Sequence, residues 1–306
     1  MSGVLSENAG RVQGNSEQQY WYIEHTIRRI KTLSRSGIDA NTYLYGVIGD
    51  PVSHSLSPVM HNAAFDKIGY NGAYLAFNVK DINGAVAGIR ALGIRGASVT
   101  IPHKVSVMAC LDEIEEKAKH IGAVNTIVNK DGHLYGYNSD CSGAMRALLE
   151  KTDIKGKEVL LLGAGGAARA IGFGIREEGG NLTILNIIKE EGETLARDLG
   201  VNYYPLEEYR RFDSQILINA TPLGMTPKTE AMPVPADFLK EDMVVMDIVY
   251  NPLKTRLLEE AQKTGCKTVD GVSMFVYQAV SQFESWTGEK APVDLMKAVV
   301  LKALSK

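Results

Sequence analysis

Short apolar runs and longer amphipathic segments alternate along most of the chain. The short runs are rich in Val, Ile, Leu and Tyr and predict buried strands, whereas apolar residues spaced by three or four positions predict helices between them. Strands that alternate with helices are typical of an α/β fold with a mainly parallel sheet. In the first half, the predicted strands span 43–49, 73–79, 96–101, 124–129 and 133–137, and the predicted helices span 58–68, 82–92, a segment from Lys104, and 141–151.

The last two of these strands flank the turn Lys130-Asp131-Gly132. An Asp-Gly pair between β-rich runs is a strong signal for a hairpin, because both residues tolerate the positive φ angles that tight hairpin turns need. A hairpin joins antiparallel strands. We therefore expect a mixed, mainly parallel sheet in this first domain.

A glycine-rich turn opens the second half of the chain. Residues 158–163 form a leucine-rich predicted strand, Gly163-Ala-Gly-Gly-Ala-Ala168 follows, and residues 167–178 predict a helix. The pattern is the Gly-x-Gly-x-x-Ala fingerprint of dinucleotide-binding folds, in which glycines let the backbone approach a pyrophosphate and the helix N-terminus attracts its charge. The strand before the glycines and the helix after them are the context that this fingerprint requires. The turn therefore predicts a nucleotide site.

The strands that follow this turn complete a second sheet. They span 182–186, 201–204, 216–220, 244–249 and 267–269, with helices between most of them, as in a Rossmann-type sheet. Helices predicted over 272–286 and 292–304 come after the last strand, and we expect them to fold back onto the first domain. The predicted fold class is α/β, with an N-terminal α/β substrate domain followed by a Rossmann dinucleotide-binding domain. The predicted boundaries are an extension over 1–41, a substrate domain over 42–142 that residues 275–306 complete, and a Rossmann domain over 143–274.

The N-terminal extension has a pattern of its own. Residues 1–19 are polar and predict a mobile tail. Residues 21–33 predict an amphipathic helix, because the isoleucines of this segment and Leu33 fall on one face. We interpret the helix as packing on the main body of the protein, with a contact to another subunit or to a lid as the alternative.

Composition and charge narrow the class of protein. The 306 residues are 45% hydrophobic and 23% charged, as in an ordinary globular protein, and the net charge of -3 argues against a nucleic-acid partner. No apolar run approaches the ~18 residues of a membrane span, and the N-terminus lacks the apolar region of a secretory signal. We therefore expect a cytoplasmic protein without a membrane partner.

The cysteines and histidines form no recognisable site. Cys110, Cys141 and Cys266 are odd in number and far apart, so they predict neither a disulfide framework nor a set of metal ligands. The six histidines are scattered along the chain as well. For both reasons we expect no metal ion in this protein.

Polar side chains gather where the predicted strands of the first domain end. Ser55 and Ser57 follow the first strand, Lys104 follows the third, Asn125 lies at the fourth and Asp140 follows the hairpin. Ligands of open α/β sheets bind beyond the carboxyl ends of the strands. Hydroxyls, an amide, a lysine and a carboxylate at that edge predict a site for a small polyhydroxylated ligand. The alternative interpretation is that each residue only caps a helix, forms a turn or carries a surface charge.

Several longer stretches stand out together between Tyr43 and the C-terminus. They are Gly49-Asp-Pro-Val-Ser-His-Ser-Leu-Ser-Pro58, Val99-Thr-Ile-Pro-His-Lys104, Gly122-Ala-Val-Asn-Thr126, Gly136-Tyr-Asn-Ser-Asp140, Gly163-Ala-Gly-Gly-Ala-Ala-Arg169, Asn219-Ala-Thr-Pro-Leu-Gly-Met225, Asp247-Ile-Val-Tyr-Asn-Pro252 and Asp270-Gly271 to Gln278. In this order they resemble the shikimate/quinate dehydrogenase family. The resemblance implies two α/β domains and the reversible, NADP-linked reduction of 3-dehydroshikimate to shikimate, on the pathway to chorismate and the aromatic amino acids.

The resemblance also implies roles for individual residues. Lys104 and Asp140 correspond to the catalytic pair: a lysine can supply the proton that moves as a hydride is transferred, and its charge stabilises a developing alkoxide. The residues implied to hold the substrate are Ser55, Ser57, Thr100, Asn125, Asp140, Tyr250 and Gln278. The residues implied to contact the dinucleotide are Gly163, Ala164, Gly165, Gly166, Ala167, Asn186, Ile187, Ile248 and Gly271.

One stretch departs from the family pattern and bears on the cofactor. NADP-using members carry Asn-Arg-Thr after the second Rossmann strand, where the arginine and threonine bind the 2′-phosphate, and this chain has Asn186-Ile187-Ile188 instead. The guanidinium that pairs with a phosphate is missing, and so is the acidic residue that would bind the ribose hydroxyls of NAD. Lys189 or Arg169 could compensate. The family favours NADP, whereas the local residues favour NAD or the use of both.

Three alternatives stay open at this point. The first is a quinate-preferring or dual quinate/shikimate dehydrogenase, because Ser55 and Ser57 exclude neither acid. The second is a nucleotide-sensing binding protein without turnover, against which the presence of both Lys104 and Asp140 argues. The third, a methylenetetrahydrofolate dehydrogenase, fits the Ser-x-Ser and Asn-Ser-Asp stretches less well. The oligomeric state is open, with a homodimer as one candidate, and His103 beside the lysine is interpreted as a structural residue.

Overall fold

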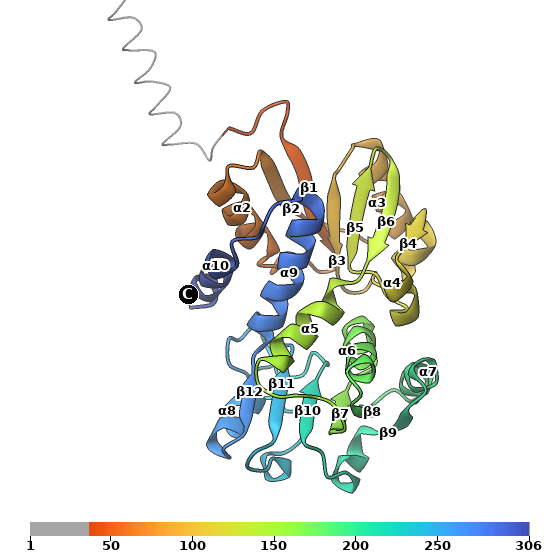
Figure 1. Ribbon diagram of the computed structural model, residues 1–306, viewed down its shortest axis with the longest axis vertical. Coiled ribbons are helices and arrows are strands. Elements are labelled where there is room, and N and C mark those ends of the chain that lie inside the picture. Colours follow the sequence, from red (N-terminus) through yellow and green to blue (C-terminus); the bar gives the residue numbers. More distant parts are fainter. Residues whose placement is uncertain (1–36, 306) are drawn as a thin grey trace, which may run out of the picture. The chain divides into compact units, whose positions relative to one another are not determined.

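Two six-stranded sheets organise the computed structural model, which describes residues 37–305 (Figure 1). The described residues from Tyr43 onward form one compact unit. The tail predicted over 1–19 and the helix predicted over 21–33 both lie outside the described residues. Strands and helices alternate from Tyr43 to Leu304, which confirms the predicted α/β class.

The first sheet is mixed, as predicted. Its strands are β1 (Tyr43–Gly49), β2 (Gly72–Asn78), β3 (Gly96–Val99), β4 (Glu113–Ile114), β5 (Thr126–Lys130) and β6 (His133–Tyr137), in the spatial order β2-β1-β3-β5-β6-β4. β1 pairs in parallel with β2 and β3, whereas β5 pairs antiparallel with β3 and β6. Asp131 and Gly132 have φ angles of 52° and 92°, so the turn between β5 and β6 uses the positive φ values that its sequence permits.

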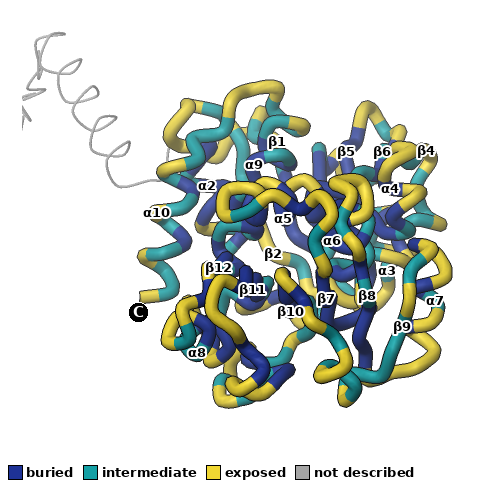
Figure 2. Tube along the Cα trace, turned by 60° about the horizontal axis from the view of Figure 1, so that its bottom comes forward, coloured by how far each residue is buried: buried dark blue, intermediate teal, exposed yellow. Residues whose placement is uncertain are grey.

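The second sheet is parallel throughout. Its strands are β7 (Glu158–Leu162), β8 (Asn181–Asn186), β9 (Asn202–Pro205), β10 (Ile216–Asn219), β11 (Val244–Asp247) and β12 (Lys267–Val269), in the order β12-β11-β10-β7-β8-β9. This is the Rossmann order, in which the direction of winding switches between β7 and β10 and ligands bind at that point. All residues of β10 and β11 and all of β7 after Glu158 are buried (Figure 2), as helices on both faces of a parallel sheet produce.

Most of the helices lie where the sequence predicts them. They are α2 (Ser57–Ile68), α3 (Ile82–Ala91), α4 (Glu116–Ile121), α5 (Ser139–Leu149), α6 (Gly166–Glu177), α7 (Lys189–Leu199), α8 (Arg256–Lys263), α9 (Gly271–Thr287) and α10 (Val293–Leu304), with short 3-10 turns over Leu206–Arg211 and Ala236–Phe238. The helix predicted from Lys104 is wrong: the segment forms only a 3-10 turn over Ser106–Cys110, because Leu111 is extended and leads into β4. β4 and α4 are not evident from the sequence, since elements this short show no hydrophobic period.

Helices α9 and α10 pack against the first sheet although they follow the second in sequence. α9 runs beside α5 (Figure 1). Phe283 of α9 and Met296 of α10 are fully buried in a cluster with Tyr45 of β1, Phe65 of α2 and Tyr74 of β2. The C-terminal helices therefore complete the core over one face of the first sheet. The residue boundaries of the two domains stay a prediction.

Candidate active site

Lys104 and Asp140 form a close, shielded ion pair. Lys104 lies in the turn after β3, and Asp140 lies in the first turn of α5. Lys104 Nζ is 2.5 Å from Asp140 Oδ2, and the two side chains are only 15% and 6% exposed. The first turn of a helix stabilises a carboxylate electrostatically. The pair therefore holds one ammonium group in a defined place, from which it can donate a proton.

Capping of α5 does not explain Asp140. Asn138 is the N-cap residue, and its side chain accepts a hydrogen bond of 3.2 Å from the Cys141 N–H. The Asn138 amide also donates to the Ala123 carbonyl oxygen at 2.9 Å, which fixes the start of the helix against the preceding strand. Asp140 is thus free of a capping role, and its carboxylate faces the lysine.

Ser55 and Ser57 lie at the start of α2. Leu56 between them is the N-cap residue and offers no capping side chain. The Ser57 N–H donates to Ser55 Oγ at 3.3 Å, so Ser55 partly replaces a cap. Ser57 is buried and has the Tyr74 hydroxyl as a polar neighbour. The structure therefore places both serines at the end of β1, one partly exposed and one buried.

The turn that carries Lys104 is anchored on both sides. Thr100 follows β3 and fits against Gly49 of β1, where any Cβ would lie 2.3 Å from the Thr100 methyl group. His103 is buried, and its Nε2 lies 2.7 Å from the Val79 carbonyl oxygen. His103 thus has the partner that its structural interpretation requires, and it holds the residue next to the lysine.

Asn125 lies beside the start of α5. Its Oδ1 accepts from the Ser139 N–H at 2.8 Å, and its Nδ2 donates to Ser139 Oγ at 2.9 Å. Ser139 Oγ donates in turn to Gln278 Oε1 of α9 at 3.4 Å. Because Ser139 immediately precedes Asp140, the structure brings Asn125 and Gln278 to the Lys104–Asp140 pair.

Tyr250 follows β11 of the second sheet, yet its ring lies against α9. It stacks on Phe275 with ring centroids 4.5 Å apart, and the Phe275 carbonyl oxygen accepts a bond of 2.9 Å from Gln278 Nε2. Burial raises the pKa of Tyr250, so its hydroxyl is a neutral hydrogen-bonding group at physiological pH. Tyr250, which follows β11, thus packs against the same helix that carries Gln278.

The predicted dinucleotide turn has the conformation that its glycines permit. Gly163 has a φ angle of +110°, and a Cβ there would lie 3.0 Å from the Ala220 carbonyl oxygen. A Cβ at Gly165 would meet nothing within 4 Å, whereas one at Gly166 would lie 3.1 Å from the Lys104 side chain. α6 begins at Gly166 without a side-chain cap, so its first N–H groups are open to an anion. The turn therefore fits a pyrophosphate.

Ile248 and Gly271 meet at the same edge of the second sheet. Ile248 follows β11, and Gly271 begins α9 directly after β12. A Cβ at Gly271 would lie 2.6 Å from the Ile248 carbonyl oxygen, so this approach requires glycine. Ala164 is buried under the glycine turn, and Ala167 lies in the first turn of α6. All four residues lie where a Rossmann sheet holds its ligand.

Asp247 fastens the loops on this side of the site, although no local pattern in the sequence gives it a role. Thr255 Oγ1, the Val249 N–H and Asn219 Nδ2 donate to its carboxylate at 2.6, 3.0 and 2.9 Å. Burial raises the pKa of Asp247 to about 6. Asn219 ends β10 and Asp247 ends β11, so their bond ties together the loops that follow these strands. Both residues open stretches that carry the family resemblance, which was the available signal.

The end of β8, where a 2′-phosphate would lie, is apolar and exposed. Ile187 and Ile188 are 70% and 51% exposed, and Asn186 Nδ2 donates to the Ile188 carbonyl oxygen at 2.9 Å. Arg169 is already engaged: its Nη1 lies 2.8 Å from Asp198 Oδ2, and its side chain is 17% exposed. A phosphate would have to displace Asp198 to pair with this guanidinium.

Lys189 is the other cation close to this position. Its Nζ lies 3.7 Å from Glu193 Oε1, and its side chain is 69% exposed. Glu190 and Glu191 share the first turn of α7 with it. The carboxylates of these three glutamates outnumber the one solvated ammonium, so the group as a whole repels a phosphate more than it attracts it.

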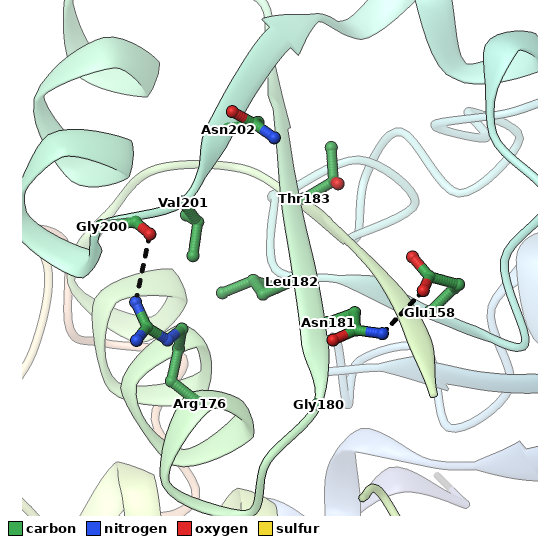
Figure 3. Close-up of a pocket in the computed structure, with 9 residues that line it drawn as sticks. All are labelled: Glu158, Arg176, Gly180, Asn181, Leu182, Thr183, Gly200, Val201 and Asn202. Atoms are coloured by element: carbon green, nitrogen blue, oxygen red, sulfur yellow. Dashed lines mark hydrogen bonds between the residues drawn. The ribbon is translucent and has the colours of Figure 1, made fainter. Parts of the chain in front are cut away.

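A separate hollow of about 320 Å³ lies at the opposite edge of the second sheet (Figure 3). Glu158, Asn181 and Asn202, at the amino ends of β7, β8 and β9, contribute to its lining. Figure 3 shows Arg176 directed at the Gly200 carbonyl oxygen and Asn181 directed at Glu158, so these polar groups already have partners. Ligands of open α/β sheets bind at the carboxyl ends of the strands. We therefore assign this hollow no part in the site.

Residues 37–305 contain no cluster of metal-ligating side chains. Within that range, no group of three or more His, Cys, Asp or Glu side chains is arranged to hold a metal ion. The helices of the same range include none long and apolar enough to cross a membrane.

The sequence matches two domain models of one family. Residues 47–127 match the shikimate dehydrogenase substrate binding domain. Residues 271–301 match the shikimate 5′-dehydrogenase C-terminal domain. The first match includes the turn with Lys104, and the second includes the α9 residue Gln278.

Relatives match over nearly the whole chain. The shikimate dehydrogenase (NADP+) of Thermococcus kodakarensis is 47% identical over 275 residues, which cover 88% of this chain and 99% of the relative. The structure is similar to that of a shikimate dehydrogenase in complex with NADP+, with a TM-score of 0.85, 43% identity, and 89% of this chain and 99% of that chain covered. It is also similar to shikimate 5-dehydrogenase from Listeria monocytogenes in complex with shikimate and NAD, with a TM-score of 0.79, 39% identity, and 86% and 98% covered. As its motifs indicate, the chain belongs to the shikimate dehydrogenase family.

Proposed function

We propose that the chain catalyses the reversible, NAD(P)-linked reduction of 3-dehydroshikimate to shikimate. The observation that carries the proposal is the shielded Lys104–Asp140 pair in contact with the glycine turn of the Rossmann sheet. A dehydrogenase of this kind needs a proton donor beside its dinucleotide site. Lys104 meets this requirement, because its side chain borders Gly166 and Asp140 holds its ammonium group.

Reduction of a ketone to an alcohol adds a hydride to carbon and a proton to oxygen. A nicotinamide cofactor, when bound, would supply the hydride in this direction and accept it in the other. Lys104 donates the proton to the ketone oxygen, and its positive charge stabilises the negative charge that develops there. Asp140 orients the ammonium group and accepts a hydrogen bond from a neighbouring substrate hydroxyl. In the oxidation of shikimate the same lysine takes the proton from the hydroxyl.

The other predicted ligands suit a small acid with several hydroxyl groups. Ser55 and Ser57 offer hydroxyl donors to a carboxylate, and Asn125 and Gln278 offer amides that can both donate to and accept from ring hydroxyls. Tyr250 adds a neutral phenol from the side of the second sheet. We expect Thr100 to bind the substrate as well, because it begins the turn that ends in the lysine.

The glycine turn before α6, which has room for a pyrophosphate, indicates the residues that would hold the dinucleotide. Gly163, Gly165 and Gly166 would leave room for the pyrophosphate, and the open N–H groups of α6 would bind its oxygens. Ile248 and Gly271 would border the nicotinamide, because they lie at the carboxyl edge beyond β11 and β12.

We further propose that the chain discriminates only weakly between NADP and NAD. Ile187 and Ile188 offer a 2′-phosphate no charge, Arg169 is paired with Asp198, and Lys189 lies among carboxylates. NADP use by relatives supports NADP as one cofactor, and these residues support NAD as the other. The preference for NADP should therefore be much smaller than in family members that carry the arginine.

The initial rate of shikimate oxidation, measured with NADP and with NAD and repeated with quinate, tests the proposed function. Turnover of shikimate with much slower turnover of quinate supports the biosynthetic reaction. Comparable or faster turnover of quinate would make the chain a quinate or dual dehydrogenase. No turnover in any combination would contradict an enzymatic function and leave a nucleotide-binding protein, which a fluorescence titration with NAD and NADP would detect.

Two coarser expectations also belong to the proposal. A homodimer is one candidate for the oligomeric state, and the elution volume of the purified chain with its scattered-light mass measures it. A cytoplasmic location, inferred from the composition and from the cysteine pattern, is measured by fractionation of cells that express the chain.

A further inference from the structure

A chain of buried hydrogen bonds runs beneath the predicted substrate ligands. It begins at Tyr74 of β2, whose hydroxyl donates to Ser98 Oγ of β3 at 2.6 Å. Ser98 Oγ donates to Gln282 Oε1 of α9 at 2.7 Å. Tyr74, Ser98 and Gln282 are only 0%, 7% and 1% exposed. Polar groups buried this deeply depend on their protein partners, because an unpaired one costs free energy.

The side-chain amide of Gln282 makes three bonds and has one orientation. Oε1 accepts from Ser98, while Nε2 donates to the Asn125 carbonyl oxygen at 3.1 Å and to Thr126 Oγ1 at 3.0 Å. A carbonyl oxygen can only accept, so the amide nitrogen has to face Asn125. Gln282 therefore links α9 both to β3 and to the start of β5.

The hydrogen bonds continue from Thr126 into the site. Thr126 Oγ1 donates to Asn125 Oδ1 at 2.7 Å, and Asn125 Nδ2 donates to Ser139 Oγ at 2.9 Å. Ser139 immediately precedes Asp140. Asn125 is thus held at its backbone by Gln282 and at its side chain by Thr126 and Ser139. All the hydrogen bonds of this series point the same way: in each of them the donor is nearer to Tyr74 and the acceptor is nearer to Ser139.

We propose that Gln282 is a positioning residue for the substrate, because it sets the place of Asn125 beside the Lys104–Asp140 pair. Gln282 itself makes its bonds inside the protein and acts through Asn125. The inference rests on the proposed function, because it concerns how that site holds shikimate.

Gln282 and Gln278 have different roles in this proposal. Both lie on α9, one helical turn apart, and the family resemblance assigns only Gln278 to the substrate. Gln278 donates to the Phe275 carbonyl oxygen of its own helix through Nε2, and its Oε1 accepts a long bond of 3.4 Å from Ser139 Oγ. Gln282 bonds three groups of the first sheet. Gln282 therefore positions the groups beside which Gln278 would bind the substrate.

Two matched pairs of variants of the full chain test the proposal. Gln282→Met keeps the length of the side chain and removes its three hydrogen bonds. Gln262→Met is its control, because Gln262 bonds Thr268 on the exposed surface of α8. Thr126→Val removes the hydroxyl that joins Gln282 to Asn125 Oδ1, whereas Thr126→Ser retains it. For each variant, kcat and the KM values for shikimate and for NADP are measured.

We expect Gln282→Met and Thr126→Val to raise the KM for shikimate about tenfold. Either change displaces the Asn125 amide or leaves it unpaired, and the hydrogen bonds that it makes to the substrate become weaker. The KM for NADP should change by less than about twofold, because the dinucleotide binds to the other sheet. Thr126→Ser and Gln262→Met should match the wild type. A residue that only stabilises the fold would lower the melting temperature without changing the ratio of the two KM values.

Other outcomes decide against the proposal. Equal rises in both KM values, or an unchanged KM for shikimate in folded Thr126→Val, would overturn it. If Gln282→Met does not fold, the comparison of Thr126→Val with Thr126→Ser decides alone. A wild type that does not turn over shikimate would overturn the proposed function and this inference together, whereas an active wild type with an unaffected Thr126→Val overturns the inference only.

Discussion

A Cβ at Gly166 would lie 3.1 Å from the side chain of Lys104, so the glycine turn and the predicted catalytic lysine are in direct contact. Gly166 begins α6 in the second sheet, and Lys104 follows β3 in the first. A larger residue at position 166 would push on the lysine, which Asp140 holds from the other side. A side chain at position 166 would therefore crowd the lysine as well as the pyrophosphate that the fingerprint implies.

Replacement of Lys104 should abolish most of the activity and leave the fold in place. We expect Lys104→Ala to lower kcat for shikimate oxidation by about 10²–10⁴, the usual span for removal of a general acid–base group. Steady-state rates measure the loss, and far-UV circular dichroism checks the fold. Lys302→Ala, at an exposed position of α10, is the matched control. Near-normal turnover of a folded Lys104→Ala would remove the lysine from the mechanism.

An arginine after β8 should create a preference for NADP. The double variant Ile187→Arg, Ile188→Thr places a guanidinium and a hydroxyl where a 2′-phosphate would lie, and we expect it to raise the ratio of kcat/KM for NADP over NAD by about tenfold or more. Ile187→Leu, which adds no charge, should leave the ratio unchanged. In the wild type, a preference for NADP above about a thousandfold would contradict our interpretation of Ile187 and Ile188, since that needs ~4 kcal/mol of phosphate recognition.

Titration of Asp247 should affect stability between about pH 4 and 6. Burial raises the pKa of this carboxyl from 3.8 to about 6 in the folded protein, so the folded state binds the proton more tightly than the unfolded state does. Its contribution to stability therefore falls as the pH rises through this window, and is constant above it. Asp247→Asn does not titrate. As the pH rises from about 4 to 6, the unfolding free energy of this variant should therefore increase by about 3 kcal/mol relative to that of the wild type, at ~1.4 kcal/mol per unit of pKa shift.

Urea unfolding of both proteins at several pH values measures this difference. The asparagine also changes the hydrogen bond to Thr255. This change adds the same amount to the difference in unfolding free energy at every pH, so it does not alter how that difference varies with pH. A difference in unfolding free energy that does not vary between pH 4 and 6.5 would show that Asp247 keeps an ordinary pKa in the folded chain.

His61 should have the opposite effect at acid pH. Its ring stacks on Tyr74 with centroids 4.5 Å apart, and neither ring nitrogen has a hydrogen-bond partner among the described residues. Burial lowers the pKa of His61 from 6.5 to about 3. The unfolded chain therefore binds the proton more readily, and stability that is fully present above pH 6.5 is lost as the pH falls toward 3.

The variant His61→Phe keeps an aromatic ring in this cluster and cannot be protonated. We expect the unfolding free energy of the wild type to fall by about 3 kcal/mol relative to this variant between pH 6.5 and 4, at ~1.4 kcal/mol for each unit. The same replacement at His54, an exposed residue, is the control for the introduction of a phenylalanine. If the unfolding free energies of the wild type and His61→Phe varied with pH in the same way, the result would contradict a buried, neutral His61.

Local patterns in the sequence determined most of the elements. The strands Tyr43–Gly49, His133–Tyr137 and Lys267–Val269 match their predicted bounds, because each is an apolar run between turn-forming residues. The Asp-Gly hairpin and the glycine turn before α6 are also legible, since the conformation of such turns depends on a few consecutive residues. β4 could not be predicted because it is too short to show a hydrophobic period, and the segment after Lys104 was wrongly predicted as a helix.

Tertiary structure decided which distant groups meet. Hydrophobic periodicity shows which face of an element is buried, but a polar residue on that face acquires its role only from the partner that packing brings to it. Lys104 and Asp140 were named by resemblance, and their 2.5 Å contact comes from the packing of α5 beside the turn after β3. Gln282 and His61 have no local signature at all, and Asp247 stands out only as the first residue of a stretch that carries the family resemblance. The hydrogen bonds of Gln282 and Asp247 and the shifted pKa values of Asp247 and His61 arise from burial among elements far apart in the chain, which no stretch of sequence contains by itself.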